Sequence, residues 1–175
     1  MVEIDKKVDF FKYYYEKEEK RKEQINQQLF YYITLISLQI TWLGYYFLNL
    51  PPFKQNCLLC IFLLLILISI ILLLIVGYYI YLYMKNGKYY YMPYPNELSG
   101  YIDQLDSSDE FKKTLCEYYV DASQKNVSTN DSRQAFIIKI RNLLSINIIV
   151  LSLAFVPYFI LCGEYINTYK VVILK

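Results

Sequence analysis

Three long runs of the chain contain no Asp, Glu, Lys or Arg, and they constrain the fold more than any other feature. The runs are Leu29 to Leu50, Asn56 to Met84 and Asn142 to Cys162. A helix rises about 1.5 Å per residue, so the shortest run reaches roughly 31 Å, enough to cross a hydrocarbon core about 30 Å thick. The sequence therefore predicts an all-α integral membrane protein with three transmembrane helices, a long N-terminal cytoplasmic helix and a small helical cytoplasmic module.

The second run gives the strongest of these predictions. Its centre, Leu58 to Val76, is nearly pure Leu, Ile and Phe. Such an uncharged aliphatic stretch rarely occurs as a buried helix of a small globular domain, so a soluble fold is disfavoured. The tyrosines that follow are typical of a membrane interface, where amphipathic rings prefer to lie: Tyr78, Tyr79, Tyr81 and Tyr83.

The runs and the charges between them divide the chain into seven segments. We expect a charged cytoplasmic helix (1–28), a first span (29–50), a tight extracytoplasmic turn (51–55), a second span (56–84), a cytoplasmic helical segment (85–141), a third span (142–162) and an extracytoplasmic tail (163–175). Pro51 and Pro52 stop the first helix, which makes the first two spans antiparallel neighbours.

The orientation follows from the distribution of the 18 basic residues. Segments 1–28 and 85–141 hold all of them except Lys54, Lys170 and Lys175. The positive-inside rule then places the N-terminus and the middle segment in the cytoplasm, as in a multi-pass protein of the bacterial inner (plasma) membrane. Two glycosylation acceptor patterns, which begin at Asn126 and Asn130, argue for a lumenal middle segment, but such triplets are common by chance.

The cytoplasmic segments read as helices. No Gly or Pro interrupts Asp9 to Gln28, so this helix is expected to continue into the first span. It carries a broken apolar stripe that can rest on the membrane, pack on a helix or belong to a solvated stalk: Val8, Phe11, Tyr15, Ile25 and Leu29. In the middle segment, Pro93 and Pro95 precede a short amphipathic helix marked by Leu98, Ile102 and Leu105.

Further along, Ser107 to Glu110 resembles a capping box that opens a second helix, with Phe111, Leu115, Tyr118 and Ala122 on one face. The polar stretch Gln124 to Ser132 is expected to interrupt the chain before a third helix, from about Asp131, enters the last span. The module is too small for much of a core of its own, so we expect it to pack on the N-terminal helix or on copies of itself.

The residues give little support for catalysis. The chain has no histidine, the commonest general base and metal ligand. Cys57 and Cys60 form a C-x-x-C without the further ligands of a zinc site, so apolar packing is the better interpretation. We expect no enzyme activity, no catalytic residue, no metal and no cofactor. The net charge of +2 also gives no reason to expect direct nucleic-acid binding.

Small and uncharged polar residues in the spans are the candidate functional positions. They are candidate pore-lining or helix-packing residues: Thr34, Ser37, Thr41 and Gly44 in the first span, and Ser145, Asn147 and Ser152 in the third. Such residues let helices approach closely and hydrogen-bond in lipid, so they fit either a narrow pore in an oligomer or a seam between helices. A homo-oligomer is expected, since three spans offer few contacts within one chain.

The plan of the chain resembles one known class. A charged N-terminal helix, a tight hairpin of two spans, a Tyr-rich exit from Tyr78 to Tyr94 and a small helical segment look like the SLATT-type membrane effectors of bacterial antiphage systems. The plan is also similar to that of small membrane accessory proteins encoded beside some CRISPR nucleases or reverse transcriptases. The resemblance implies an oligomer that permeabilises or depolarises the inner membrane when a cytoplasmic sensor detects infection, as in abortive infection. A sensor protein would contact residues 95–141.

Two alternatives remain open. The chain can be a membrane anchor or scaffold for a cytoplasmic partner, or a phage holin or small membrane toxin. The 57 residues between the second and third spans argue against a holin. An anchor needs no polar stripe in its spans, so substitutions at Thr34, Ser37 and Thr41 distinguish an anchor from a pore.

Overall fold

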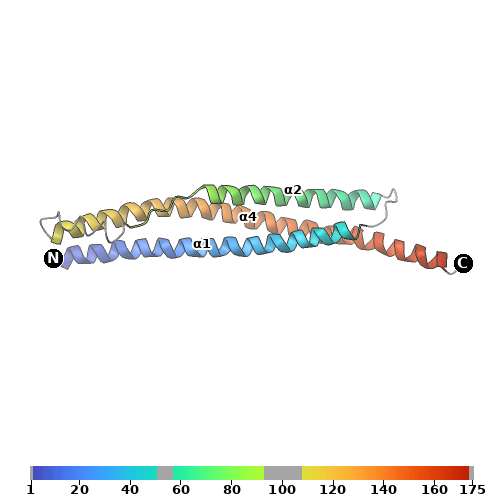
Figure 1. Cartoon of the computed structure of the whole chain (residues 1–175), viewed down its shortest axis with the longest axis horizontal. Coiled ribbons are helices and arrows are strands. Elements are labelled where there is room, and N and C mark those ends of the chain that lie inside the picture. Colours follow the sequence, from blue (N-terminus) through green and yellow to red (C-terminus); the bar gives the residue numbers. More distant parts are fainter. Residues whose placement is uncertain (1, 51–56, 93–107, 174–175) are drawn as a thin grey trace. The chain divides into compact units, whose positions relative to one another are not determined.

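The computed structural model describes residues 2–50, 57–92 and 108–173, and this part of the chain forms three α-helices and no strand. They are α1 (Val2–Leu48), α2 (Cys57–Lys85) and α4 (Ser108–Ile173), as Figure 1 shows. The predicted all-α fold is confirmed. The predicted turn at 51–55 and the short helix around Leu98, Ile102 and Leu105 lie outside the described residues.

Helix α1 is continuous over 47 residues, as the absence of helix breakers predicted. It carries the charged N-terminal segment and the first apolar run in one element. The break between charged and apolar composition, at Gln28 and Leu29, leaves the helix intact, because both segments consist of residues compatible with a helix.

Helix α4 corrects a prediction, because it runs for 66 residues without the interruption expected between Gln124 and Ser132. That stretch contains no Gly or Pro, and its two asparagines are fully buried with hydrogen-bonded side chains. Their polarity therefore marks a contact face and not a loop. The helix also tolerates Pro157, whose missing N–H removes one backbone hydrogen bond of the ladder.

Within the described residues, two helices are long and apolar enough to cross a membrane: α2 and α4. The third predicted span, in α1, is not among them, since its apolar residues alternate with Tyr, Thr, Ser and Gln39. Three spans therefore stay a prediction. Only 28% of the most apolar stretch of α2 and 33% of that of α4 is buried within the chain.

The chain divides into two compact units. The first, which we call the charged unit, comprises Met1–Gln28 and Tyr83–Ile137. The second, the apolar unit, comprises Leu29–Leu82 and Ile138–Lys175. Each unit is described by itself below.

The core of the apolar unit lies among all three helices. Tyr46 of α1 is 1% exposed, and its ring lies 5.5 Å from that of Phe62 on α2 and 5.1 Å from that of Tyr158 on α4. The cluster is completed by aliphatic and small residues: Leu43, Leu59, Ile66, Leu151, Ala154 and Leu161. Edge-to-face and tilted aromatic contacts of this kind add about 0.5–1.5 kcal/mol per pair beyond burial.

In the charged unit, the N-terminal part of α1 packs on the first half of α4. Ile25 is 1% exposed, and the rings of Tyr15 and Tyr119 lie 5.7 Å apart. An ion pair joins Asp5 Oδ1 to Lys112 Nζ at 2.6 Å. The apolar stripe of the N-terminal segment is therefore a helix-packing face, and the expected packing of the module on this helix is confirmed.

Candidate functional site

A polar layer interrupts the apolar core of the second unit. Gln39 on α1 and Asn147 on α4 are 2% and 0% exposed. Asn147 Nδ2 donates to Gln39 Oε1 at 2.6 Å, and Gln39 Nε2 donates to the carbonyl of Leu144 at 3.3 Å. Two amide side chains in an otherwise apolar interior thus bind each other across the helices.

The hydrogen bonds also fix how α1 and α4 pack. Gln39 reaches the carbonyl of Leu144, and Tyr46 reaches that of Leu151 at 3.1 Å. Each step is seven residues on both helices, so α1 and α4 run in the same direction with a heptad repeat. Such packing is typical of helices that cross at about 20°.

Counting along the helices places Ser69 on α2 at the level of this layer. The ring contact between Tyr46 and Phe62 sets the register of α1 against α2, which runs the opposite way (Figure 1). Gln39 precedes Tyr46 by seven residues, and Ser69 follows Phe62 by seven residues, so both lie the same distance along the pair from the ring contact. Ser69 is 0% exposed. Each of the three helices therefore contributes one buried polar side chain to the layer.

Two oxygen atoms of the layer accept or donate no hydrogen bond among the described residues: Asn147 Oδ1 and Ser69 Oγ. A buried polar group left without a partner costs about 1–3 kcal/mol. Native proteins therefore satisfy nearly all such groups, through protein atoms or through ordered water. The layer is the least satisfied part of the apolar unit.

The hydroxyl stripe predicted in the first span lies elsewhere. Thr34, Ser37 and Thr41 are exposed, on the face of α1 opposite Gln39, Leu43 and Tyr46. Each hydroxyl donates to the carbonyl four residues earlier in α1, at 2.9–3.1 Å. The stripe thus forms no seam between helices of one chain, and its hydroxyls need no partner to face lipid. Whether it packs between copies or lines a pore stays a prediction.

The remaining predicted residues divide between the two faces. Ser145 and Ser152 on α4 are exposed, and they donate to the carbonyls of Arg141 and Ile148 at 3.0 and 2.8 Å. Gly44 is half-buried, and a Cβ there would meet nothing within 4 Å. Of the seven predicted residues, only Asn147 lies in the interior. Sequence reasoning missed Gln39 and Ser69, although their polarity within uncharged runs was a signal.

In the charged unit, a non-helical segment that we call the strap (residues 86–92) lies along α4. Asn126 accepts a hydrogen bond from the backbone N–H of Tyr90 and donates to its carbonyl, both at 2.9 Å. Asn130 accepts from the hydroxyl of Tyr89 at 2.6 Å and donates to Glu18. Both asparagines are 0% exposed. Asn126 thus binds both backbone groups of Tyr90, and Asn130 binds the Tyr89 side chain.

These contacts bear on the glycosylation patterns at Asn126 and Asn130. Every polar atom of the two amides has a protein partner, and both side chains are buried in a helix. A glycan on either amide nitrogen is incompatible with this packing. The patterns therefore give no argument for a lumenal middle segment.

Cationic side chains of α1 and α4, Lys22 and Arg133, contact the tyrosines of the strap. Lys22 Nζ lies 4.6 Å from the ring centres of both Tyr89 and Tyr91 and donates to the Tyr91 hydroxyl at 2.9 Å. Burial lowers the pKa of Lys22, but the Tyr91 hydrogen bond and the charge of Glu19 outweigh it and raise the pKa above the usual value. Lys22 thus stays charged, and its cation–π contacts persist.

Arg133 binds the start of the strap. Its guanidinium donates to the carbonyls of Asn86 and Gly87 at 3.1 and 3.4 Å. It also lies over the rings of Tyr83 and Tyr89, at 4.8 and 4.6 Å from their centres. Gly87 has a φ of 142°, a conformation that L side chains rarely adopt, and a Cβ there would lie 2.5 Å from Arg133 Nε.

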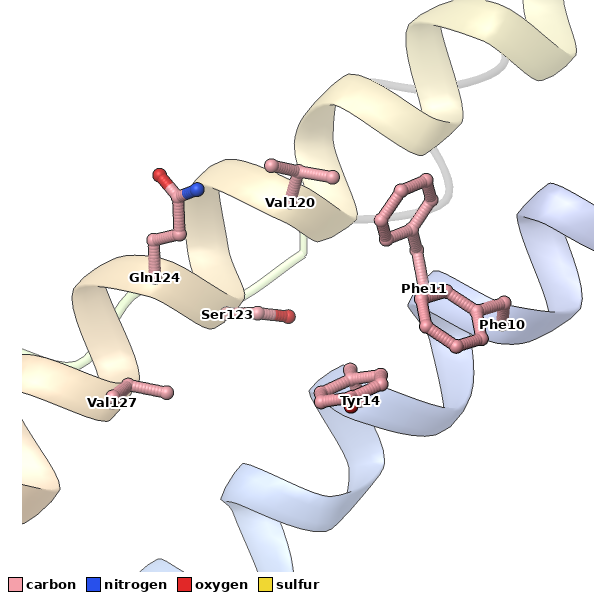
Figure 2. A pocket seen from close by; sticks show the side chains of 7 residues that line it. All are labelled: Phe10, Phe11, Tyr14, Val120, Ser123, Gln124 and Val127. Atoms are coloured by element: carbon pink, nitrogen blue, oxygen red, sulfur yellow. The ribbon is translucent and has the colours of Figure 1, made fainter.

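An apolar groove lies between α1 and α4 of the charged unit (Figure 2). Its volume is about 270 Å³, and aromatic and aliphatic side chains from both helices line most of it. Phe10 and Tyr14 remain 55% and 44% exposed. The lining residues are Phe10, Phe11, Tyr14, Val120, Ser123, Gln124 and Val127.

The cysteines and carboxylates form no metal site among the described residues. Cys57 and Cys60 are both exposed, so the expected apolar packing of this pair is not seen against the residues that the structure describes. Cys116 and Cys162 are partly buried and free.

Comparisons with protein-family models, curated proteins and solved structures found no match. The resemblance to SLATT-type effectors therefore stays a prediction from the plan of the chain.

Proposed function

We propose that the chain crosses the inner membrane three times and, as an oligomer, permeabilises or depolarises that membrane in a bacterial defence system. The observation that carries the membrane part is the outward apolar surface of α2 and α4, whose most apolar stretches are only 28% and 33% buried. A core helix of a soluble protein would be mostly covered by its own chain. Lipid is the simplest cover for this much aliphatic surface.

The parallel direction of α1 and α4 supports the proposed topology. The Gln39–Leu144 and Tyr46–Leu151 hydrogen bonds require both helices to run the same way within the apolar unit. If all three helices cross, the segments that precede the spans of α1 and α4, residues 1–28 and 85–141, lie on the same side of the membrane. Those segments carry 15 of the 18 basic residues, so this side is the cytoplasm.

The polar layer supports permeabilisation over simple anchoring. An anchor needs only apolar spans, whereas this unit keeps two amides and a serine in its interior. Uncharged polar side chains inside membrane helices either hydrogen-bond the helices together or face a water-filled path, and the two oxygens without a partner favour the path. The proposed output is a leak and needs no catalytic residue.

The anchor or scaffold remains the second candidate, and the groove of the charged unit favours it. Phe10, Phe11 and Tyr14 present apolar surface in a segment that is otherwise rich in charge. Such a surface suits a helix of a cytoplasmic partner. A holin is a weaker candidate, because the charged unit is large and has its own buried contacts.

The deciding experiment follows membrane potential with a voltage-sensitive dye in cells that express the protein with its neighbouring genes during phage challenge. We expect depolarisation at the time of protection. A steady potential in protected cells would refute the leak and favour the anchor. The purified protein in dye-loaded vesicles provides the same test without the host.

The topology has a separate test. A membrane-impermeant thiol reagent added to intact cells should reach Cys162 and spare Cys116. Labelling of Cys116 from outside would invert the topology. Cys162→Ala is the control that assigns the signal, and permeabilised cells should allow Cys116 to react.

A further inference from the structure

We infer that the layer of Gln39, Ser69 and Asn147 is a water-binding site inside the apolar unit. Each residue comes from a different helix, and all three are at least 98% buried. Asn147 Oδ1 and Ser69 Oγ have no hydrogen-bond partner among the described residues. One water molecule donates two hydrogen bonds and accepts two, so it satisfies an amide oxygen and a hydroxyl together.

The chemistry of the layer selects water over the other occupants. The free groups are one carbonyl oxygen and one hydroxyl, and no carboxylate or cationic side chain belongs to the layer. A cation would lack the charged or multiple oxygen ligands that it needs. An apolar molecule would leave both oxygens unpaired. Gln39 already has one partner at each end of its amide, because its oxygen accepts from Asn147 and its nitrogen donates to the carbonyl of Leu144.

The site is confined to this level of the unit. Seven residues from Ser69 on the same face of α2, Val76 is 0% exposed and apolar. Seven residues the other way, Phe62 belongs to the aromatic cluster with Tyr46 and Tyr158. Water is thus expected at the layer, with dry levels on either side of it.

The inference deepens the proposed function, on which it rests for the membrane setting. A path for ions through a helical unit needs an interior point that binds water, and this layer supplies one. The exposed hydroxyls of Thr34, Ser37 and Thr41 supply none within the single chain, because each binds its own helix.

The test is water-to-protein magnetisation transfer by solid-state NMR on the native protein in lipid bilayers, with labelled Asn, Ser and Val. The expected result is a transfer rate at least several-fold higher for Ser69 and Asn147 than for Val76, the matched dry position. Ser69→Ala and Asn147→Leu assign the two signals. Asn147→Leu should also slow transfer to Ser69, because it removes one of the two groups that hold the water.

Equal rates at Ser69 and Val76, whether both slow or both fast, would overturn the inference. Slow rates would mean a dry layer, and fast rates would mean a seam that is wet along its length. The measurement does not depend on a leak. Rapid transfer at Ser69 with no depolarisation in cells would refute the proposed function and leave the water site standing. Depolarisation in cells with slow transfer at Ser69 would refute the water site and leave the proposed function standing.

Discussion

Replacing Asn126 with alanine should weaken the docking of the strap on α4. The amide makes two hydrogen bonds of 2.9 Å, one from the N–H of Tyr90 and one to its carbonyl. Each such bond contributes about 1 kcal/mol net, and the groups left behind in a partly buried place add to the cost. We therefore expect docking of the strap to weaken by about 2–3 kcal/mol. Since 1.4 kcal/mol is a factor of ten, that is roughly 30- to 150-fold.

Amide hydrogen exchange of the strap measures this effect directly. The N–H of Tyr90 should exchange about 30- to 150-fold faster in Asn126→Ala than in the native protein, in the same detergent or bilayer. Ser128→Ala is the matched control, because Ser128 lies two residues away on the same helix and is exposed. It should change exchange little. Unchanged protection of Tyr90 in Asn126→Ala would show that the strap is held without this amide.

Three further predictions test other features. Gly87→Ala should destabilise the charged unit by more than about 1 kcal/mol, because the φ of Gly87 is 142° and the new Cβ would collide with Arg133. Gly77→Ala is the control in a thermal-unfolding comparison, because a Cβ at Gly77 has no atom within 4 Å and should not destabilise the protein. Burial raises the pKa of Cys116, so its neutral thiol persists to higher pH, and its alkylation rate should rise at higher pH than that of an exposed cysteine in a pH series. A variant with Leu at Thr34, Ser37 and Thr41 should insert normally but self-associate more weakly in nanodiscs, which a measurement of the particle mass detects. The control variant carries Ile40→Leu and Phe47→Leu, two exposed positions outside the stripe. An unchanged mass in the triple variant would exclude this face from assembly.

The helices were predictable because their signals are local. The three uncharged runs and the absence of breakers before Gly44 are properties of contiguous sequence and need no distant partner. The all-α class and the long first helix followed from them. The number of spans did not follow as firmly, because Tyr, Thr and Gln39 dilute the apolar character of α1.

The continuity of α4 was not predictable from composition alone. The stretch from Gln124 to Ser132 looks like a linker, since it is polar and rich in Asn and Ser. Its partners are the strap and Glu18, which lie about 40 and 110 residues away in the chain. No local rule connects them. A polar helix face that binds a distant segment has the same sequence signature as a loop.

The buried polar layer shows which polar residues in an apolar run are informative. A hydroxyl can bind the carbonyl four residues earlier in its own helix, as Thr34 and Ser145 do, so its presence implies no partner on another element. An amide has two donor hydrogens and an acceptor oxygen, and a helix offers it no complete local solution. Four of the six buried polar side chains among the described residues are amides: Gln39, Asn126, Asn130 and Asn147. All four form hydrogen bonds with another element of their unit. Gln and Asn are therefore better markers than Ser and Thr of where the helices meet.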